Sequence, residues 1–226
     1  MITSADNRTL KLVRRLASAR QREKLGLFVC EGEDLVDAAR AVGVEPVELL
    51  VAGENVDPAL LADVSSLGHP PRVIGIFRRD DLLRREPPPV GLSLWHVGDP
   101  GNVGTLIRTA DALGPAFVAL SDGCADPTGP KAVRASMGAL FCVPLIAFDD
   151  APRPWVALVP DGGESLTGAN GATFVLGAER EGIPDDVLAR CDRRATIPLA
   201  AGAESLNVAA AGAIALYEHV CRRSTV

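Results

Sequence analysis

The stretch IPLAAGAESLNVAAAGAIALYE, residues 197–218, joins a short apolar run to a long alanine-rich pattern through the polar cluster Glu204-Ser205-Leu206-Asn207. The apolar run predicts a strand, and the alanine-rich pattern predicts a helix that begins near Leu206. Hydroxyl and amide side chains therefore lie where a helix begins, a place at which ligands and reacting groups are often held. The alternative is a plain helix cap, because Ser and Asn commonly satisfy the free backbone N–H groups there.

The composition is that of a globular protein with one large domain or two small ones. The chain has 226 residues, of which 47% are hydrophobic, and this length suits either arrangement. Its five cysteines form no CxxC pair and its three histidines lie far apart, which argues against a disulfide framework or a zinc site. The N-terminus has no apolar signal region, and no run approaches the roughly 18 apolar residues of a membrane span. We therefore expect a cytoplasmic protein that does not associate with a membrane.

The segment of residues 7–24 is basic, although the whole chain carries a net charge of −6. It holds seven cationic side chains against the single acid Glu23. Such a cluster can neutralise phosphates of a nucleic acid, and a solvated basic helix face is the alternative. The candidate phosphate contacts are Arg8, Arg14, Arg15, Arg20, Arg22 and Lys24.

A proline-rich break predicts two sections. Three consecutive prolines within REPPPVG cannot continue a helix or a central strand, so residues 87–90 are expected to form an extended linker. The N-terminal section, residues 1–86, alternates strands and helices and predicts a small α/β layer. Its expected helices cover residues 7–24 and 33–43, and its expected strands cover residues 27–32, 47–53 and 72–77.

The C-terminal section, residues 91–226, predicts a parallel sheet covered by helices on both faces, because its strands read as near-continuous apolar runs. Ligands of such sheets bind beyond the carboxyl ends of the strands. The expected strands cover residues 92–97, 116–121, 140–148, 155–160, 173–177 and 195–199. The expected helices cover residues 100–114, 129–136, 185–190 and 206–222.

The first glycine-bearing turn of this section is WHVGDPGNVGTLIRTADALG, residues 95–114. Its glycines follow the spacing GxxGxxG, which is not the GxGxxG of a dinucleotide-binding fingerprint. Asn102 stands at the expected helix start, where a cap is the alternative to a functional role. Arg108 lies inside the same helix, and a guanidinium there could grip a phosphate with two hydrogen bonds.

A second turn, FVLGAEREGIP at residues 174–184, carries Glu179 between two glycines. Taken alone, it could equally be a charged surface loop. The two turns and the opening stretch each follow an expected strand of one parallel sheet, so all three are expected to meet at one edge. This convergence favours a shared site over three unrelated caps and loops.

These segments also match a known family in order and spacing. NVGTLIRTADALG, FVLGAEREGIP and IPLAAGAESLNVAAAGAIALYE resemble the three sequence motifs of the SpoU/TrmH branch of the SPOUT RNA methyltransferases. PTGPKAVRASMGALFCVPL resembles the segment between them, and REKLGLFVCEG resembles the start of the accessory RNA-binding domain of two-domain members. The resemblance runs through most of the chain and is most specific in the last motif.

The resemblance implies a fold and an activity. The fold is α/β: a parallel sheet covered by helices, with a C-terminal trefoil knot, preceded by a small α/β RNA-binding domain, and the molecule is a homodimer. The activity is methyl transfer from S-adenosylmethionine to a ribose 2′-hydroxyl of structured RNA, either tRNA or rRNA. No metal is expected, because the leaving group already carries a positive charge.

The resemblance also assigns roles to residues. The adenosine part of the cofactor is expected at Leu176, Gly177, Ile197, Leu199, Gly202 and Leu206. The catalytic set is Asn102, Arg108, Glu179, Ser205 and Asn207. Within that set, Arg108 is the residue that we expect to be essential, either as a base or as an electrostatic stabiliser of the developing alkoxide. The base role is chemically awkward, since an arginine normally keeps its proton.

Two other functions compete with this one. The first is a non-catalytic RNA-binding protein with a methyltransferase-like fold, which the intact set Asn102, Arg108, Ser205 and Asn207 disfavours. The second is a Rossmann-type nucleotide enzyme, which the glycine spacing disfavours. The sequence does not indicate which RNA or which nucleotide is modified.

Overall fold

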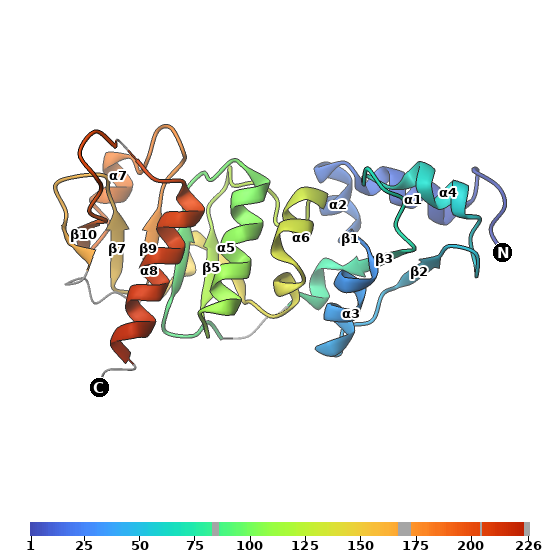
Figure 1. Cartoon of the computed structure of the whole chain (residues 1–226), viewed down its shortest axis with the longest axis horizontal. Helices are drawn as coiled ribbons and strands as arrows, with labels where there is room; N and C mark the ends of the chain where they lie inside the picture. Colours follow the sequence, from blue (N-terminus) through green and yellow to red (C-terminus); the bar gives the residue numbers. More distant parts are fainter. Residues whose placement is uncertain (83–85, 167–172, 204, 224–226) are drawn as a thin grey trace.

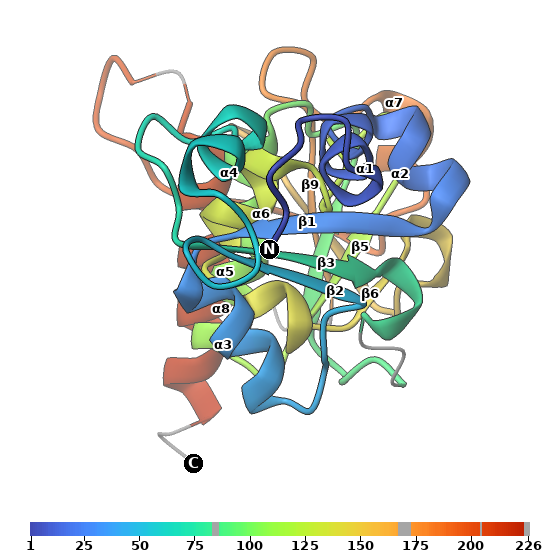
Figure 2. The same cartoon turned by 90° about the vertical axis from the view of Figure 1, so that its right-hand side faces the viewer.

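The computed structural model describes residues 1–82, 86–166, 173–203 and 205–223. The described chain forms two sheets, and it completes the first sheet before the second begins. The N-terminal section lies on the right in Figure 1 and the C-terminal section on the left. Figure 2 looks at the molecule from the side of the N-terminal section.

The sheet of the N-terminal section is antiparallel, with the strand order β1-β3-β2. In Figure 2, α1 and α4 lie over one face of this sheet and α3 lies over the other. Helix α1 is amphipathic: its buried Leu10, Val13 and Leu16 pack with Leu50 and Ile74 of the sheet. The elements are α1 (Arg8–Leu16), α2 (Ala19–Leu25), β1 (Leu27–Glu31), α3 (Glu33–Ala41), β2 (Glu48–Val51), α4 (Pro58–Val64) and β3 (Val73–Arg78).

The structure corrects two details of the prediction for this section. The basic segment forms two helices, because α1 ends at Leu16 and α2 begins at Ala19. Helix α4 was not predicted from the sequence; it is capped by Asp57, whose carboxylate accepts a hydrogen bond from the Ala59 N–H at 2.8 Å. Pro58 at its first position is a common helix start, so the signal was present.

The C-terminal section contains a seven-stranded, wholly parallel sheet with the order β6-β5-β4-β9-β7-β10-β8. Helices α5 and α8 lie side by side against one face (Figure 1). The elements are β4 (Gly91–Leu94), α5 (Pro100–Ala112), β5 (Phe117–Leu120), α6 (Pro130–Ser136), β6 (Leu145–Ala147), β7 (Trp155–Leu158), β8 (Glu164–Ser165), β9 (Thr173–Leu176), α7 (Asp185–Leu188), β10 (Arg193–Thr196) and α8 (Val208–Arg223), with short 3-10 turns η1 (Arg79–Asp81), η2 (Ala139–Phe141) and η3 (Phe148–Asp150).

One predicted strand of this section is wrong over most of its length. Residues 140–148 were expected to be extended, but residues 139–141 form the 3-10 turn η2 and only β6 is a strand. The apolar character of this run has another cause, because Phe141 packs against Phe28 and Phe77 of the N-terminal section, with ring centroids 6.0 and 5.2 Å apart. Strand β4 is shorter than predicted and ends at Leu94, and α8 begins at Val208 rather than at residue 206.

A shared apolar core joins the two sections. Phe28 and Phe77 belong to the same buried cluster as Leu92, Phe141 and Leu176 of the C-terminal section. The N-terminal section is therefore packed against the parallel sheet rather than tethered to it loosely. The division at the proline-rich linker remains a prediction.

Candidate active site

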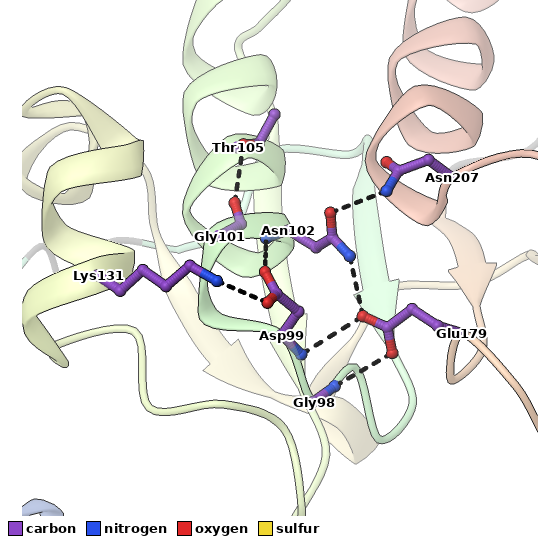
Figure 3. Close-up of polar contacts among 8 residues, drawn as sticks. All are labelled: Gly98, Asp99, Gly101, Asn102, Thr105, Lys131, Glu179 and Asn207. Carbon is purple, nitrogen blue, oxygen red and sulfur yellow. Dashed lines mark hydrogen bonds and ion pairs between the residues drawn. The ribbon is translucent and has the colours of Figure 1, made fainter.

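Three loops meet at the carboxyl edge of the parallel sheet. The first leads from β4 into α5, the second follows β9, and the third leads from β10 into α8. They bring Asn102, Glu179 and Asn207 into one hydrogen-bonded cluster, shown in Figure 3. The predicted convergence of the three glycine-bearing and polar turns is thus observed for these three residues.

The carboxylate of Glu179 is the acceptor at the centre of the cluster. Its Oε1 accepts a hydrogen bond from the Asn102 side chain at 2.9 Å and faces the Asp99 N–H at 3.4 Å, while Oε2 faces the Gly98 N–H at 3.4 Å. Partial burial raises the pKa of Glu179, but the hydrogen bonds from Asn102 and from these backbone groups outweigh it, so that pKa lies below its ordinary value. The carboxylate is therefore ionised at neutral pH.

Asn207 belongs both to a helix cap and to the cluster. Its Oδ1 accepts hydrogen bonds from the N–H groups of Ala209 at 2.9 Å and Ala210 at 3.3 Å, which caps the first turn of α8. Its Nδ2 donates to Oδ1 of Asn102 at 3.1 Å. The two interpretations of this motif are therefore compatible, because one amide group performs both tasks.

Asp99 and Lys131, which the sequence pattern did not identify, hold the helix start that carries Asn102. Asp99 caps α5 by accepting the Asn102 N–H at 3.0 Å, and Lys131 of α6 pairs with the other Asp99 oxygen at 2.7 Å. The hydrogen bond from Lys131, followed by that from the Asn102 N–H, lowers the pKa of Asp99. The dipeptide Asp99-Pro100 at a helix start was the available signal for the cap, whereas the partner Lys131 could be found only from the fold.

Arg108 and Ser205 do not join this cluster. Arg108 is exposed on α5, six residues beyond Asn102, which corresponds to about 9 Å along the helix axis. Ser205 is exposed in the loop before α8, and its neighbour Glu204 lies outside the described residues. Within the described ranges, no hydrogen bond or ion pair links the side chain of either Arg108 or Ser205 to another residue.

The positions expected to hold adenosine surround the same edge. Leu176 is buried at the end of β9, and Gly177 follows it in a turn so tight that a Cβ atom would lie 2.2 Å from the Gly182 backbone. Gly202 has a φ of +89°, which favours glycine. Ile197 and Leu199 are half-buried, and Leu206 keeps 40% of its surface exposed. The loop after β9 and the loop between β10 and α8 therefore offer apolar side chains and small residues at this edge, which suits a flat heteroaromatic ligand.

The predicted phosphate contacts divide into two groups. Arg8, Arg14, Arg15, Arg20 and Lys24 are all exposed on α1 and α2; Arg14 pairs with Asp63 at 2.7 Å, and Arg15 donates to Gln21 at 3.0 Å. The prediction that Arg22 contacts a phosphate is wrong. Its side chain is 5% exposed and is paired with Asp126 at 2.8 Å, so it cannot reach a phosphate.

Metal sites and membrane-spanning helices each have recognisable structural requirements. In the ranges that the structure describes, no group of three or more His, Cys, Asp or Glu side chains is arranged to hold a metal ion. None of the described helices combines the length and the apolar character that crossing a membrane requires.

Comparison with known proteins places the chain in a family. Residues 89–217 match the model of the SpoU rRNA Methylase family. The 23S rRNA (guanosine(2553)-2′-O)-methyltransferase RlmP of Bacillus subtilis is 31% identical over 96% of this chain and 97% of its own length. An uncharacterised tRNA/rRNA methyltransferase of Synechocystis sp. is also 31% identical, over 96% of this chain and 92% of its own length.

Solved structures give the same result for the whole fold. The AdoMet-bound rRNA methyltransferase of Sinorhizobium meliloti superposes with a TM-score of 0.85 at 27% identity, covering 100% of this chain and 98% of that one. The SpoU methyltransferase AviRb of Streptomyces viridochromogenes, in complex with AdoMet, gives a TM-score of 0.85 at 25% identity over 97% of this chain and 99% of that one. With a matching family model, full-length relatives and the three-loop cluster at the carboxyl edge of a parallel sheet, this chain belongs to the SpoU rRNA methylase family.

Proposed function

We propose that this chain transfers a methyl group from S-adenosylmethionine to a ribose 2′-hydroxyl of rRNA or tRNA. The observation that carries the proposal is the cluster of Asn102, Glu179 and Asn207, which joins all three family motifs at one sheet edge. The names of the relatives support the substrate class, since RlmP acts on a guanosine of 23S rRNA. Because structured cellular RNA is the proposed substrate, we also propose that the protein acts in the cytoplasm.

The proposed cofactor fits the residues at this edge. Ile197, Leu199 and Leu206 supply apolar surface, while the backbone at Leu176, Gly177 and Gly202 would let main-chain groups approach the adenine ring closely. When bound there, the cofactor supplies a methyl group on a positively charged sulfur, so the departing group is neutral. The task left to the protein is to align the ribose oxygen and to stabilise the charge that develops on it.

The polar residues would share that task. A guanidinium is a cationic donor and a poor proton acceptor, so Arg108 suits stabilisation of the developing alkoxide or attachment of the neighbouring phosphate better than it suits a base role. Asn102 and Asn207 would position the ribose by hydrogen bonds, and the Glu179 carboxylate holds Asn102 in one orientation. Ser205, exposed beside Asn207, is free to turn toward the substrate.

The proposed quaternary structure is a homodimer formed through α5 and α8. These neighbouring helices carry the exposed Arg108, Ile214 and Tyr217, with Ile214 39% and Tyr217 59% exposed. Exposed large apolar side chains on a helix surface are typical of protein interfaces. Light scattering coupled to gel filtration tests this proposal: a mass of twice 23.6 kDa is expected, and a monomeric mass at micromolar concentration contradicts it.

We also propose that the N-terminal section holds RNA through the exposed cations of α1 and α2, and that the C-terminal part of the chain forms a trefoil knot. The position of β9 between β4 and β7 and the likeness to SpoU methyltransferase structures support the knot.

Replacing Arg20 and Lys24 by Ala tests the RNA surface. The double variant should bind RNA more weakly, and the slope of the logarithm of its affinity against the logarithm of salt concentration should fall by about two, one for each lost phosphate contact. An unchanged salt slope would contradict this assignment.

A transfer assay tests the central proposal. Purified protein is incubated with total RNA and S-adenosylmethionine labelled in its methyl group, and the RNA is then digested to nucleosides. The expected product is a labelled 2′-O-methyl nucleoside. RNA binding without transfer would instead support the non-catalytic alternative, and label on a base would contradict the proposed acceptor.

Arg108→Ala separates catalysis from cofactor binding. Because the Arg108 side chain is exposed and forms no hydrogen bond or ion pair with another described residue, its removal should leave the free energy of unfolding and the cofactor affinity unchanged. Methyl transfer should fall by about 100-fold or more, as when a positioned donor is lost from a reacting oxygen. Full turnover by the variant would show that the role given to Arg108 is wrong.

A further inference from the structure

Arg22 is a buried cation at the junction of the two sections. Its Nη1 donates to the carbonyl oxygens of Leu16 and Ala17, both at 2.9 Å, at the carboxyl end of α1. Its Nε and Nη2 contact Oδ2 of Asp126 at 2.9 and 2.8 Å. The guanidinium of Arg22 on α2 therefore contacts both the end of α1 and a loop of the C-terminal section, and it fixes the three segments relative to one another.

Asp126 is fully engaged on the opposite side of this junction. Its Oδ1 accepts hydrogen bonds from the Thr128 N–H at 2.9 Å and from the Thr128 hydroxyl at 2.6 Å. Arg79 of the N-terminal section adds a second cation at 3.5 Å. Burial of an ion pair yields little net stability compared with an apolar contact, whereas its directional hydrogen bonds impose one orientation on the parts that it joins.

The loop that carries Asp126, residues 121–128, lies directly against the active-site turn between β4 and α5. The Ala125 N–H donates to the Val97 carbonyl at 2.9 Å, and the His96 N–H donates to the Ser121 hydroxyl at 2.9 Å. Val97 is followed by Gly98, whose N–H faces the Glu179 carboxylate. A continuous series of contacts thus leads from Arg22 to the cluster of Asn102, Glu179 and Asn207.

We propose that Arg22 and Asp126 are positioning residues for methyl transfer. In this proposal, which rests on the proposed function, the pair sets the orientation of α1 and α2 relative to the β4–α5 turn. RNA held by the exposed cations of these helices then reaches the active site in one register. The pair lies at the junction of the two sections and outside the cluster of Asn102, Glu179 and Asn207, so its effect is on the alignment of bound RNA and on the order of the turn.

The test uses the variants Arg22→Lys and Asp126→Asn in the full-length protein, assayed well below their melting temperatures. Five quantities are measured: the Kd for S-adenosylmethionine, the Kd for total rRNA, the kcat of methyl transfer, its KM, and amide hydrogen exchange of residues 95–99 and 121–128. Arg134→Gln is the matched control. It removes a different contact across the junction, the 2.8 Å hydrogen bond from Arg134 to the Ser66 hydroxyl, which does not touch the loop.

The proposal predicts a kcat that falls about tenfold or more in both variants, because small misplacements of reacting groups are costly. Cofactor Kd should stay within about twofold, hydrogen exchange should accelerate in the two peptides, and Arg134→Gln should behave like the unmodified protein. An unchanged kcat in both variants would overturn the proposal, whether or not hydrogen exchange accelerates. So would a parallel loss of kcat and cofactor binding, which indicates general destabilisation, or an equal loss in Arg134→Gln. An inactive unmodified protein would instead contradict the proposed function.

Discussion

At the scale of single residues, the site depends on the direction of two amide groups. Asn207 donates to Asn102, and Asn102 donates to the Glu179 carboxylate, so each amide has one defined orientation. The ionised Glu179 sets this order, because a carboxylate can only accept hydrogen bonds. The cap and the cluster are therefore one hydrogen-bonded unit, and a substitution can be chosen to separate them.

Asn207→Asp keeps the cap and breaks the cluster. The new carboxylate can still accept from the N–H groups of Ala209 and Ala210, so the free energy of unfolding should change by less than about 0.5 kcal/mol. It cannot donate to Asn102, and methyl transfer should fall by about 100-fold. Urea unfolding and the labelled-methyl assay give the two quantities.

Two alanine variants complete that experiment. Asn207→Ala should lose about 1 kcal/mol of stability as well as activity, since the cap is also removed. Asn7→Ala removes a cap of similar geometry on α1, where the Asn7 side chain accepts the Thr9 N–H at 2.8 Å, and it should lose stability without loss of kcat. Full activity of Asn207→Asp would show that Asn207 is a cap and nothing more.

The sequence predicted this part of the site better than the rest. Asn102, Glu179 and Asn207 each follow a recognisable strand, and parallel strands must bring their carboxyl ends to one edge. Arg22 illustrates the opposite case. In a sequence it is one more cation in a basic segment, and only the packing of α2 against residues 121–128 shows that it is buried and paired.

At the scale of elements, the site depends on how closely α5 approaches α6. Gly104 lies on the face of α5 that meets α6, and a Cβ atom there would come within 2.3 Å of the Ala132 carbonyl oxygen and 2.6 Å of the Ala135 Cβ. This approach also brings Lys131 of α6 to the Asp99 cap of α5. Gly104 is one of the three glycines in the GxxGxxG spacing. It is required there for the close packing of α5 against α6 rather than for binding a dinucleotide.

Gly104→Ala should destabilise the protein even though alanine favours helix formation. The backbone oxygen of Ala132 cannot turn aside, so the helices must separate, at a cost of about 1–3 kcal/mol in the free energy of unfolding. Gly68→Ala is the control, because nothing lies within 4 Å of its added Cβ. If Gly104→Ala were as stable as the control variant, the close approach of α5 and α6 would be incorrect.

Element prediction failed where tertiary contacts override local pattern. The apolar run of residues 140–148 is typical of a buried strand, yet its first two residues belong to the 3-10 turn η2, whose Phe141 packs onto Phe28 and Phe77. Pro144 separates this turn from β6. Phe141 is buried, but its partners belong to the other section, and only Leu145–Ala147 pair with the neighbouring strand β5.

At the scale of the whole molecule, the two sections share an apolar core and a buried ion pair. Breaking that pair leaves an uncompensated charge, so Asp126→Asn should lose roughly 3 kcal/mol of stability at pH 7. Burial by itself raises the pKa of Asp126. The hydrogen bonds from Thr128 and the charges of Arg79 and Arg22 together outweigh this effect, so the pKa of Asp126 lies below its ordinary value.

This lowered pKa sets the pH dependence of the loss. A carboxyl group whose pKa is depressed by folding stabilises the protein above its unfolded pKa of about 3.9, and the stabilisation disappears as the pH falls through the folded pKa. The gap between the unmodified protein and Asp126→Asn should therefore be constant from pH 7 to about 5 and should narrow below pH 4. Urea unfolding across this range measures the gap, and a gap that is equal at pH 3 and pH 7 would contradict the role of the ionised carboxylate.

Methyl transfer to RNA is a property of the whole molecule acting in the cell. Ribose 2′-O-methylation can be mapped across rRNA and tRNA from cells with the gene, without it, and with the Arg108→Ala form. We expect at least one rRNA or tRNA position to be methylated only when the unmodified gene is present. Identical methylation profiles in all three strains would contradict it.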